Sequence, residues 1–428
     1  MLFNQQLLDF ISASPTPFHA VNNAKTQLLN AGFNPLYEAD EWNLSPGNKY
    51  FVTRRDSSII AFVYGEKDIT KTGLRVLGSH TDSPCLKIKP HPDIKRHGFH
   101  QVGIEVYGGV LLSPWFDRDL SLAGRVSVVN LSGELEHHLI DFKRPVATIP
   151  SLAIHLDRTV NAERSINPQE QMSPILWQSG EGNLNEWLIE HLTAQGKLVA
   201  EILDFDLSFY DVQAGSVIGA RNEFIASARL DNLLSCFVTL QSLMASDGQV
   251  TSLVVLNDHE EVGSRSTAGA CGNLLTGLLE RIFPNVQQRH RIESQSMMLS
   301  VDNAHGVHPN FAAKHDANHA PHLNAGPVFK FDANQSYATQ SMISSQLRLI
   351  AKHAGVAVQS YVTRADMRCG STIGPITATA TGIETLDIGV PTFAMHSIRE
   401  LAGAKDPVAL FELLTAFLNN SAPLSQSI

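Results

Sequence analysis

Cysteine is scarce and scattered in this chain of 428 residues. The four cysteines are Cys85, Cys236, Cys271 and Cys369, and no two of them are close in sequence. Disulfide-stapled small folds and zinc knuckles both need closely spaced cysteines, so neither is expected. Scattered, reduced thiols are typical of a cytoplasmic protein.

An excess of basic charge is also missing. The chain has 32 lysines and arginines against 42 acidic residues, a net charge of -10. Nucleic-acid-binding domains usually carry a basic patch, so no nucleic-acid partner is expected. No apolar run approaches the ~18 residues of a membrane span, and the N-terminal residues do not resemble a signal peptide. We therefore expect a cytoplasmic protein that does not enter membranes.

The composition is that of a folded protein, with 43% hydrophobic and 17% charged residues. The length favours about two domains. Strand and helix patterns alternate in 1–86 and 225–428, which indicates a mostly parallel sheet flanked by helices. Between 87 and 224, short alternating runs punctuated by glycine and proline indicate an inserted, antiparallel β-rich domain. The predicted fold class is therefore α/β with a β-rich insertion.

Potential metal ligands gather where predicted strands end. Five of them come just after apolar strands: His80, Glu260, Glu261, Asp302 and His396. Asp231 precedes a predicted helix. Taken alone, such residues have simpler explanations. Asp231 could cap its helix, and His80 could simply hydrogen-bond Asp82, which lies two residues further along the chain. Ligands of parallel sheets, however, bind outside the carboxyl ends of the strands. The coincidence of these residues at one edge favours a binding site.

Two histidines and three carboxylates suit two zinc-like ions. A carboxylate shared by both ions would hold them about 3.5–4 Å apart, the spacing of two-metal hydrolases. The residue pattern leaves open which carboxylate bridges. A further carboxylate, not bound to metal, would move the proton during hydrolysis.

These motifs resemble the aspartyl aminopeptidases, a family of dinuclear zinc aminopeptidases, and the resemblance runs nearly end to end. It is carried by Ser-Pro-Thr-Pro-Phe-His (14–19), Ser-His-Thr-Asp-Ser-Pro (79–84), Trp-Phe-Asp-Arg-Asp-Leu (115–120), Arg-Leu-Asp-Asn (229–232), Asp-His-Glu-Glu-Val-Gly (258–263), Asp-Asn-Ala-His (302–305) and Met-His-Ser-Ile-Arg-Glu (395–400).

The resemblance implies a role for each residue of the site. It implies two Zn²⁺ ions per subunit, for which Co²⁺ or Mn²⁺ could substitute, with five ligands: His80, Asp231, Glu261, Asp302 and His396. Asp231 would bridge the ions, His80 and Asp302 would complete one site, and Glu261 and His396 the other. Glu260 would be the general base, and Asp82 would orient His80. The resemblance also implies a cis peptide bond between Asp231 and Asn232.

Two further residues carry over from the resemblance. Lys330 matches a lysine that faces the substrate. His155 matches a histidine that reaches the active site of a neighbouring subunit. It lies in the apolar stretch 151–156, which we expect to be a strand, so a core histidine is the alternative. The family also implies a homo-oligomer, a tetrahedral dodecamer built from dimers whose subunits pair through the inserted domain.

The expected function is removal of the first residue from peptide substrates, with a preference for aspartate or glutamate. Lys330 or the N–H groups of the loop 370–374 could attract such an acidic side chain. A preference for neutral residues such as leucine remains open, as does a related dinuclear carboxypeptidase or amide deacylase. A shell protein with a vestigial metal site is the non-enzyme alternative, but the complete ligand set argues against it.

Overall fold

The computed structural model describes residues 2–178 and 181–423, and the chain folds into two units. Unit 1 comprises the stretches up to Asp82, Gly215–Met395 and from Glu400 onward. Unit 2 comprises Ser83–Ala214 and His396–Arg399. The α/β class is confirmed. Within the described stretches, no helix combines the length and hydropathy needed to cross a membrane.

Unit 1 is built on a nine-stranded sheet with the order β1-β2-β3-β13-β4-β14-β18-β16-β17. The strands are β1 (Asn34–Leu36), β2 (Lys49–Arg54), β3 (Ser58–Val63), β4 (Arg75–His80), β13 (Ser252–Asn257), β14 (Met297–Val301), β16 (Val328–Phe331), β17 (Gln359–Val362) and β18 (Glu384–Gly389). The four central strands β13, β4, β14 and β18 are parallel. Because both of their faces are covered, they are almost continuous runs of buried residues.

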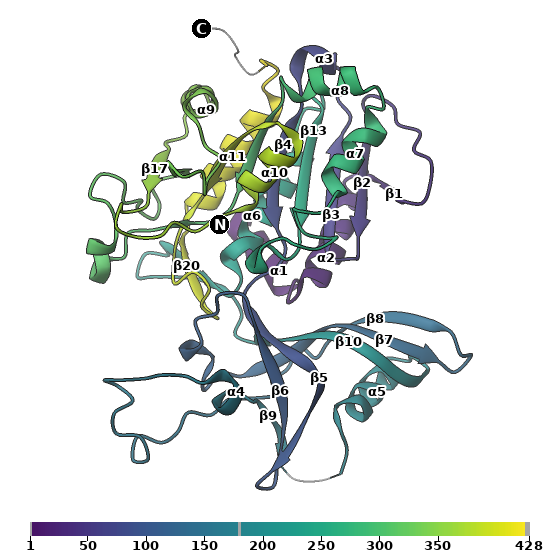
Figure 1. Cartoon of the computed structure of the whole chain (residues 1–428), viewed down its shortest axis with the longest axis vertical. Helices are drawn as coiled ribbons and strands as arrows, with labels where there is room; N and C mark the ends of the chain where they lie inside the picture. The colour runs from purple at the N-terminus through teal and green to yellow at the C-terminus, as the bar shows by residue number, and fades with distance from the viewer. Residues whose placement is uncertain (1, 179–180, 424–428) are drawn as a thin grey trace. The chain divides into compact units, whose positions relative to one another are not determined.

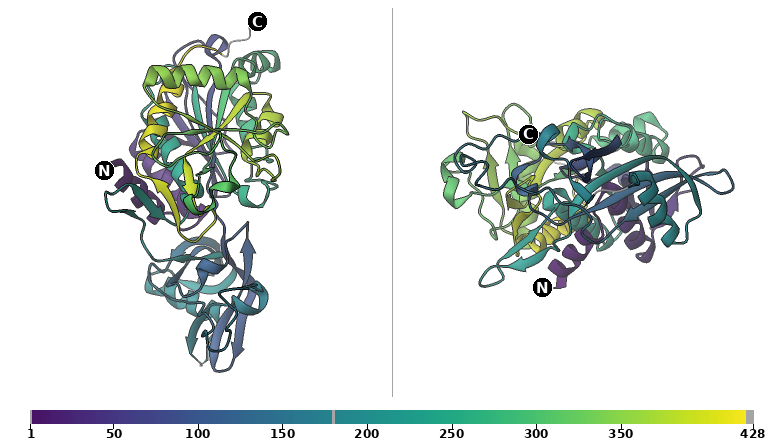
Figure 2. Two further views of the ribbon diagram at one scale, coloured as in Figure 1. Left: turned by 90° about the vertical axis from the view of Figure 1, so that its left-hand side faces the viewer. Right: turned by 90° about the horizontal axis from the view of Figure 1, so that it is seen from below.

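Helices cover both faces of this sheet (Figures 1 and 2). The helices of unit 1 are α1 (Leu2–Ser12), α2 (Pro17–Asn30), α3 (Ile69–Thr72), α6 (Leu230–Met244), α7 (Leu274–Ile282), α8 (Val286–Glu293), α9 (Ser341–Ala354), α10 (Ile373–Thr381) and α11 (Asp406–Asn419), with short 3₁₀ turns η2 (Glu260–Val262) and η3 (Pro309–Lys314). Helices α1, α2, α6, α9 and α11 bury their apolar residues in one core. Helices α7 and α8 pack into a second core on the other face.

A second, five-stranded sheet of unit 1 has the order β11-β12-β20-β19-β15. Its strands are β11 (Ser216–Ile218), β12 (Phe224–Ser227), β15 (Ala304–His305), β19 (Pro391–Phe393) and β20 (Glu400–Gly403). Strands β11 and β12 therefore belong with unit 1, whereas the predicted insertion extended to residue 224. Strand β12 pairs with β20, which in turn pairs with β19. Both β19 and β20 come from the far end of the chain, so the sequence around β11 and β12 does not reveal this pairing.

Unit 2 contains a six-stranded sheet with the order β8-β7-β10-β5-β6-β9, in which every pair is antiparallel. Its elements are β5 (Cys85–Arg96), β6 (Phe99–Tyr107), η1 (Ser113–Trp115), β7 (Leu120–Asn130), β8 (Leu135–Asp141), α4 (Pro168–Gln171), β9 (Ile175–Gln178), α5 (Leu184–Ala194) and β10 (Val199–Asp211). The unit has its own apolar core.

The stretch 151–156 is not the strand that its apolar residues suggested. Residues 154–156 form a turn, and His155 is exposed. A hydrogen bond fixes the start of this stretch, since Ser151 N–H donates to Asp117 Oδ1 at 2.8 Å. The prediction failed because no strand within residues 2–178 and 181–423 pairs with this stretch to complete its backbone hydrogen bonds. His155 is therefore not a buried core histidine.

Candidate metal centre

The central strands of unit 1 deliver acidic and histidine side chains to one edge of the sheet. Strand β4 ends at His80, and β14 is followed directly by Asp302. Glu260 and Glu261 lie in the 3₁₀ turn just after β13. Because β13, β4 and β14 are adjacent and parallel, their carboxyl ends meet at this edge. Asp231 joins them from the start of α6, which packs on β4.

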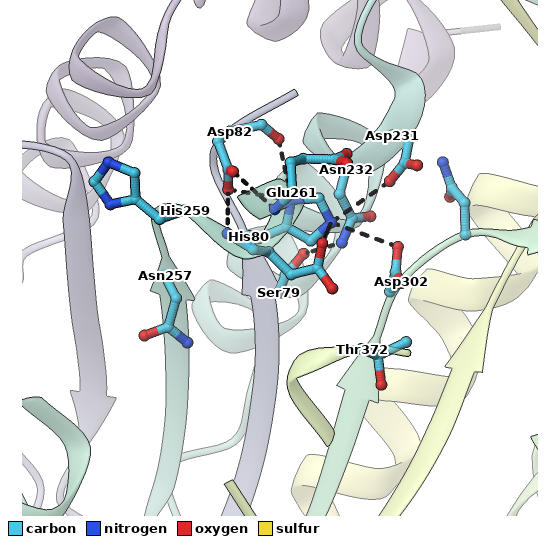
Figure 3. Close-up of polar contacts among 12 residues, drawn as sticks. Ser79, His80, Asp82, Asp231, Asn232, Asn257, His259, Glu261, Asp302 and Thr372 are labelled. Atoms are coloured by element: carbon cyan, nitrogen blue, oxygen red, sulfur yellow. Dashed lines mark hydrogen bonds and ion pairs between the residues drawn. The ribbon is translucent and has the colours of Figure 1, made fainter. Parts of the chain in front are cut away.

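His80, Asp231 and Asp302 form a compact, buried group of potential ligands. His80 Nε2 lies 3.5 Å from Asp231 Oδ1 and 3.6 Å from Asp302 Oδ1 (Figure 3). These distances are long for hydrogen bonds. Two atoms that each lie ~2.0–2.2 Å from one tetrahedral zinc ion are about 3.3–3.6 Å apart. The spacing therefore fits three ligands around a common ion better than direct hydrogen bonds.

The electrostatics of the cluster also favour a cation. Burial lowers the pKa of the His80 imidazole, but contacts with the neighbouring aspartates raise it well above its usual value. The carboxylates around His80 thus attract positive charge strongly. A divalent ion would supply that charge, and histidine and carboxylate donors are ligands that zinc prefers. The residues present therefore fit a metal ion.

Glu260 lies slightly apart from this group. Its Oε2 is 3.9 Å from His80 Nε2, beyond the spacing expected for two ligands of one tetrahedral ion. A second possible ligand group does combine Glu260 with His80 and Glu261, but the longer distance favours an unligated Glu260. Burial, opposed by His80 and assisted by nearby aspartates, raises the pKa of Glu260 to about 7. A carboxyl group with this pKa can accept and release a proton near neutral pH.

Asp82 holds the two glutamates as well as His80. Its Oδ1 accepts the Glu260 N–H and its Oδ2 accepts the Glu261 N–H, both at 3.1 Å (Figure 3). His80 Nδ1 lies 3.0 Å from the Asp82 carbonyl oxygen and 3.5 Å from Asp82 Oδ1. The sequence suggested the contact with His80 but not the two backbone contacts, because Asp82 and Glu260 lie 178 positions apart in the chain.

Asp231 occupies an irregular start of α6 rather than a helix cap. Arg229 takes the cap position in a left-handed conformation, and Asp231 and Asn232 have non-helical backbone angles. Asn232 Nδ2 donates to Ser79 Oγ and to the carbonyl of Val301, both at 3.0 Å, which ties this segment to β4 and β14. The Asp231–Asn232 peptide bond is cis, as the resemblance implied.

Lys330 is buried beside the cluster rather than exposed to solvent. Its Nζ lies 3.3 Å from Asp302 Oδ2 and donates to the carbonyl of Asn303 at 3.1 Å. Asp387 pairs with Lys330 across strands β16 and β18. Burial raises the pKa of Asp387, and the positive charge of Lys330 partly opposes that rise. The ammonium group is therefore placed to hold Asp302, a contact that the sequence did not reveal.

The loop 370–374 contributes differently from the sequence-based expectation. Thr372 caps α10, and its Oγ1 donates to Asp387 Oδ1 at 2.5 Å. A Cβ on Gly374 would lie 2.6 Å from both carboxylate oxygens of Asp387, so this backbone approaches that carboxylate very closely. The carboxyl group of Asp387 thus lies beside the start of α10.

His396 lies between β19 and β20, in the short stretch that groups with unit 2. Its Nδ1 is 3.1 Å from the carbonyl oxygen of Gly109. In metal-binding histidines, the ring nitrogen that does not bind the metal usually contacts a carbonyl or carboxylate oxygen in this way. Its predicted role as a ligand stays a prediction.

Comparisons with known proteins show which family this chain is similar to. The model of the family described as aminopeptidase I zinc metalloprotease (M18) matches residues 10–418. A probable M18 family aminopeptidase 2 of Pseudomonas putida (strain GB-1) is 53% identical over 418 residues, which is 97% of each chain. A protein of the same description from Azotobacter vinelandii is 52% identical over 425 residues, 98% of each chain.

Solved structures show the same fold. The structure described as the Ape4 and Nbr1 complex matches with a TM-score of 0.94 and 37% identity, over 98% of this chain and 86% of that one. The mApe1 dodecamer of S. cerevisiae matches with a TM-score of 0.85 and 28% identity, over 98% of this chain and 96% of that one.

Proposed function

The chain belongs to the M18 family of metallo-aminopeptidases. From this premise we propose that the protein uses two bound metal ions to remove acidic first residues from peptides. The cluster of His80, Asp231 and Asp302 beside Glu260 carries the proposal. Asp231 is proposed as the ligand shared by both ions. Glu261 and His396 are proposed as the remaining ligands of the second ion.

Chain connectivity supports the proposal for His396. It comes only four residues before Glu400, whose carboxylate accepts a hydrogen bond from the backbone of Asp231 at 2.9 Å. Four residues of chain span at most about 14 Å. This short segment therefore limits how far His396 can lie from Glu400 and from the backbone of Asp231.

Glu260 is proposed to move the proton during hydrolysis. Bound divalent ions would polarise the scissile carbonyl and lower the pKa of the attacking water. Glu260 takes a proton from that water as its oxygen bonds to the carbonyl carbon. It then gives the proton to the peptide nitrogen as the carbon–nitrogen bond breaks. The Asp82 contacts to the backbone of Glu260 keep the carboxylate in place for both transfers.

The preference for an acidic first residue is supported by the ammonium group beside the cluster. Lys330 already contacts Asp302 and Asn303, which occupies part of its donor capacity. A carboxylate of the substrate would use the remaining donor. The loop 370–374 is a weaker candidate for this role, since Asp387 already lies at the start of α10.

A homo-oligomer is proposed because the chain exposes apolar residues around His155. Leu152, Ile154 and Leu156 are 62%, 47% and 74% exposed, and the first two line a cavity of about 710 Å³. Such a patch marks an interaction surface. The similar mApe1 protein of S. cerevisiae forms a dodecamer, so we propose that this segment contacts a neighbouring subunit and presents His155 to its site.

Removal of metal is expected to abolish hydrolysis, and added Zn²⁺ to restore it. On the restored enzyme, aspartyl anilide should be cleaved about tenfold or more faster than leucyl anilide, because a hydrogen bond between charged groups contributes ~1.5–3 kcal/mol. N-acetylaspartyl anilide, which lacks the free amine, is the matched control and should resist cleavage. Cleavage confined to the acetylated substrate would indicate an amide deacylase instead.

Activity is expected to rise with pH through the region near 7. Glu260 accepts a proton only when ionised, and its pKa is raised to about 7. Below the pKa the ionised fraction falls about tenfold per pH unit, and kcat/KM falls with it. Nearby cations favour the ionised form, so the midpoint should lie at or below about 7. A pH profile of kcat/KM with metal content measured at each pH tests this, and a decline with rising pH across this range would contradict it.

A further inference from the structure

Glu400 is a buried glutamate next to the metal centre that has no role in the proposed set of ligands. It is the first residue of β20, and only 2% of its surface is exposed. Its Oε2 accepts a hydrogen bond from the N–H of Asp231 at 2.9 Å. A carboxylate removed from water needs strong hydrogen bonds or nearby positive charge. Its position beside the proposed bridging ligand therefore calls for an explanation.

The fold brings Glu400 to this place through strand pairing. Strands β12 and β20 are antiparallel, and their last pair joins Ser227 to Glu400. The chain then leaves β12, passes through Arg229 with a φ of 55°, and reaches Asp231. This turn brings the N–H of Asp231 back toward the start of β20. The contact spans 169 positions of sequence.

The N–H of Asp231 needs an acceptor from outside its helix. The first backbone N–H groups of any helix have no partner within the helix, and the first helical bond here runs from the Leu233 N–H to the Arg229 carbonyl. Asp231 is itself 4% exposed, so water is a poor substitute. Glu400 meets this need with a carboxyl oxygen that accepts the hydrogen bond.

We propose that Glu400 is a positioning residue of the metal centre, whose carboxylate fixes the backbone of Asp231 so that the Asp231 side chain is presented to the metal. The proposal rests on the metal centre described above. The Asn232 side chain secures the next residue to β4 and β14. Glu400 secures Asp231 from the second sheet of unit 1. The two contacts together fix the backbone of the ligand from both sides.

The test compares two side chains of similar size that differ in the acceptor. Glu400→Met removes the acceptor without leaving a large cavity, and Glu400→Gln keeps a carbonyl oxygen that can accept the Asp231 N–H. Glu384→Met is the matched control, since Glu384 also begins a strand of unit 1 but at the end of β18 remote from the cluster. Zn²⁺ affinity is measured on the metal-free proteins by competition with a chromophoric chelator, without substrate.

Glu400→Met is expected to weaken Zn²⁺ binding by about 10–100-fold, the usual effect of losing a partner that orients a ligand. Glu400→Gln should bind Zn²⁺ nearly as tightly as the wild type, and Glu384→Met should be unchanged. With saturating Zn²⁺, Glu400→Met should keep its KM for peptide and lose part of kcat. Wild-type affinity in Glu400→Met, or equal losses in the Met and Gln variants, would overturn the proposal.

Amide hydrogen exchange gives a readout that does not depend on either variant's activity. In the metal-free wild type, the Asp231 amide should exchange slowly, and the protection should fall in Glu400→Met but persist in Glu400→Gln. An unprotected Asp231 amide in the wild type would overturn the proposal even if the variants did not fold. If the wild type binds Zn²⁺ but cleaves no peptide, the proposed function fails while the role of Glu400 remains testable.

Discussion

Replacing Glu260 with glutamine is expected to slow hydrolysis by about 10²–10⁴-fold while both metal ions stay bound. Glutamine has nearly the shape of glutamate but cannot accept the proton of the attacking water. The backbone contact between Glu260 and Asp82 does not involve the glutamate side chain, so it should survive the change. Glu260→Gln should therefore remove the proton acceptor while the backbone of residue 260 keeps its position.

The measurement combines kcat with metal content. Wild type and Glu260→Gln are dialysed together, and metal per subunit is determined by elemental analysis before the assays. Glu280→Gln is the control, because Glu280 is an exposed residue of α7 outside the cluster. Full activity in Glu260→Gln would refute the assignment of Glu260 as the general base. Loss of metal from this variant would show instead that Glu260 is a ligand.

Replacing Glu261 with alanine is expected to reduce the metal content, which Glu260→Gln should leave unchanged. Metal content should fall from about two ions per subunit to about one, and activity should fall with it, because two-metal hydrolysis depends on both ions. The backbone of Glu261 is held by Asp82 Oδ2, so its side chain has a fixed starting point near the cluster. High Zn²⁺ concentration should restore part of the activity of Glu261→Ala but none of that of Glu260→Gln.

The two glutamates therefore serve as controls for each other. They are adjacent in sequence and share Asp82 as the partner of their backbone N–H groups. A general disturbance of this turn would affect both variants alike. If both changes removed metal to the same extent, the proposed division between a proton carrier and a ligand would be wrong.

The sequence predicted correctly that acidic and histidine side chains at strand ends come together at one edge of the sheet. His80 and Asp302 lie at the ends of apolar runs, and parallel strands bring such ends together whatever their distance in the chain. The stretch around His155 was predicted wrongly, because an apolar alternation favours a strand only when a neighbouring strand is present. The predicted anion site in the loop 370–374 stays a prediction, and the sequence did not show that the Thr372 hydroxyl in this loop donates to Asp387.

By itself the sequence determined the class of the protein, the α/β pattern, and the set of histidine and carboxylate side chains available to metal. These follow from local periodicity, composition and motifs. Only the tertiary structure decided which groups hold those side chains in place: Asp82 on the backbone of the glutamates, Lys330 on Asp302, and Glu400 on the backbone of Asp231. The physical reason is that these contacts join segments distant in the chain, often a side chain to a backbone group, and backbone groups are the same in every residue.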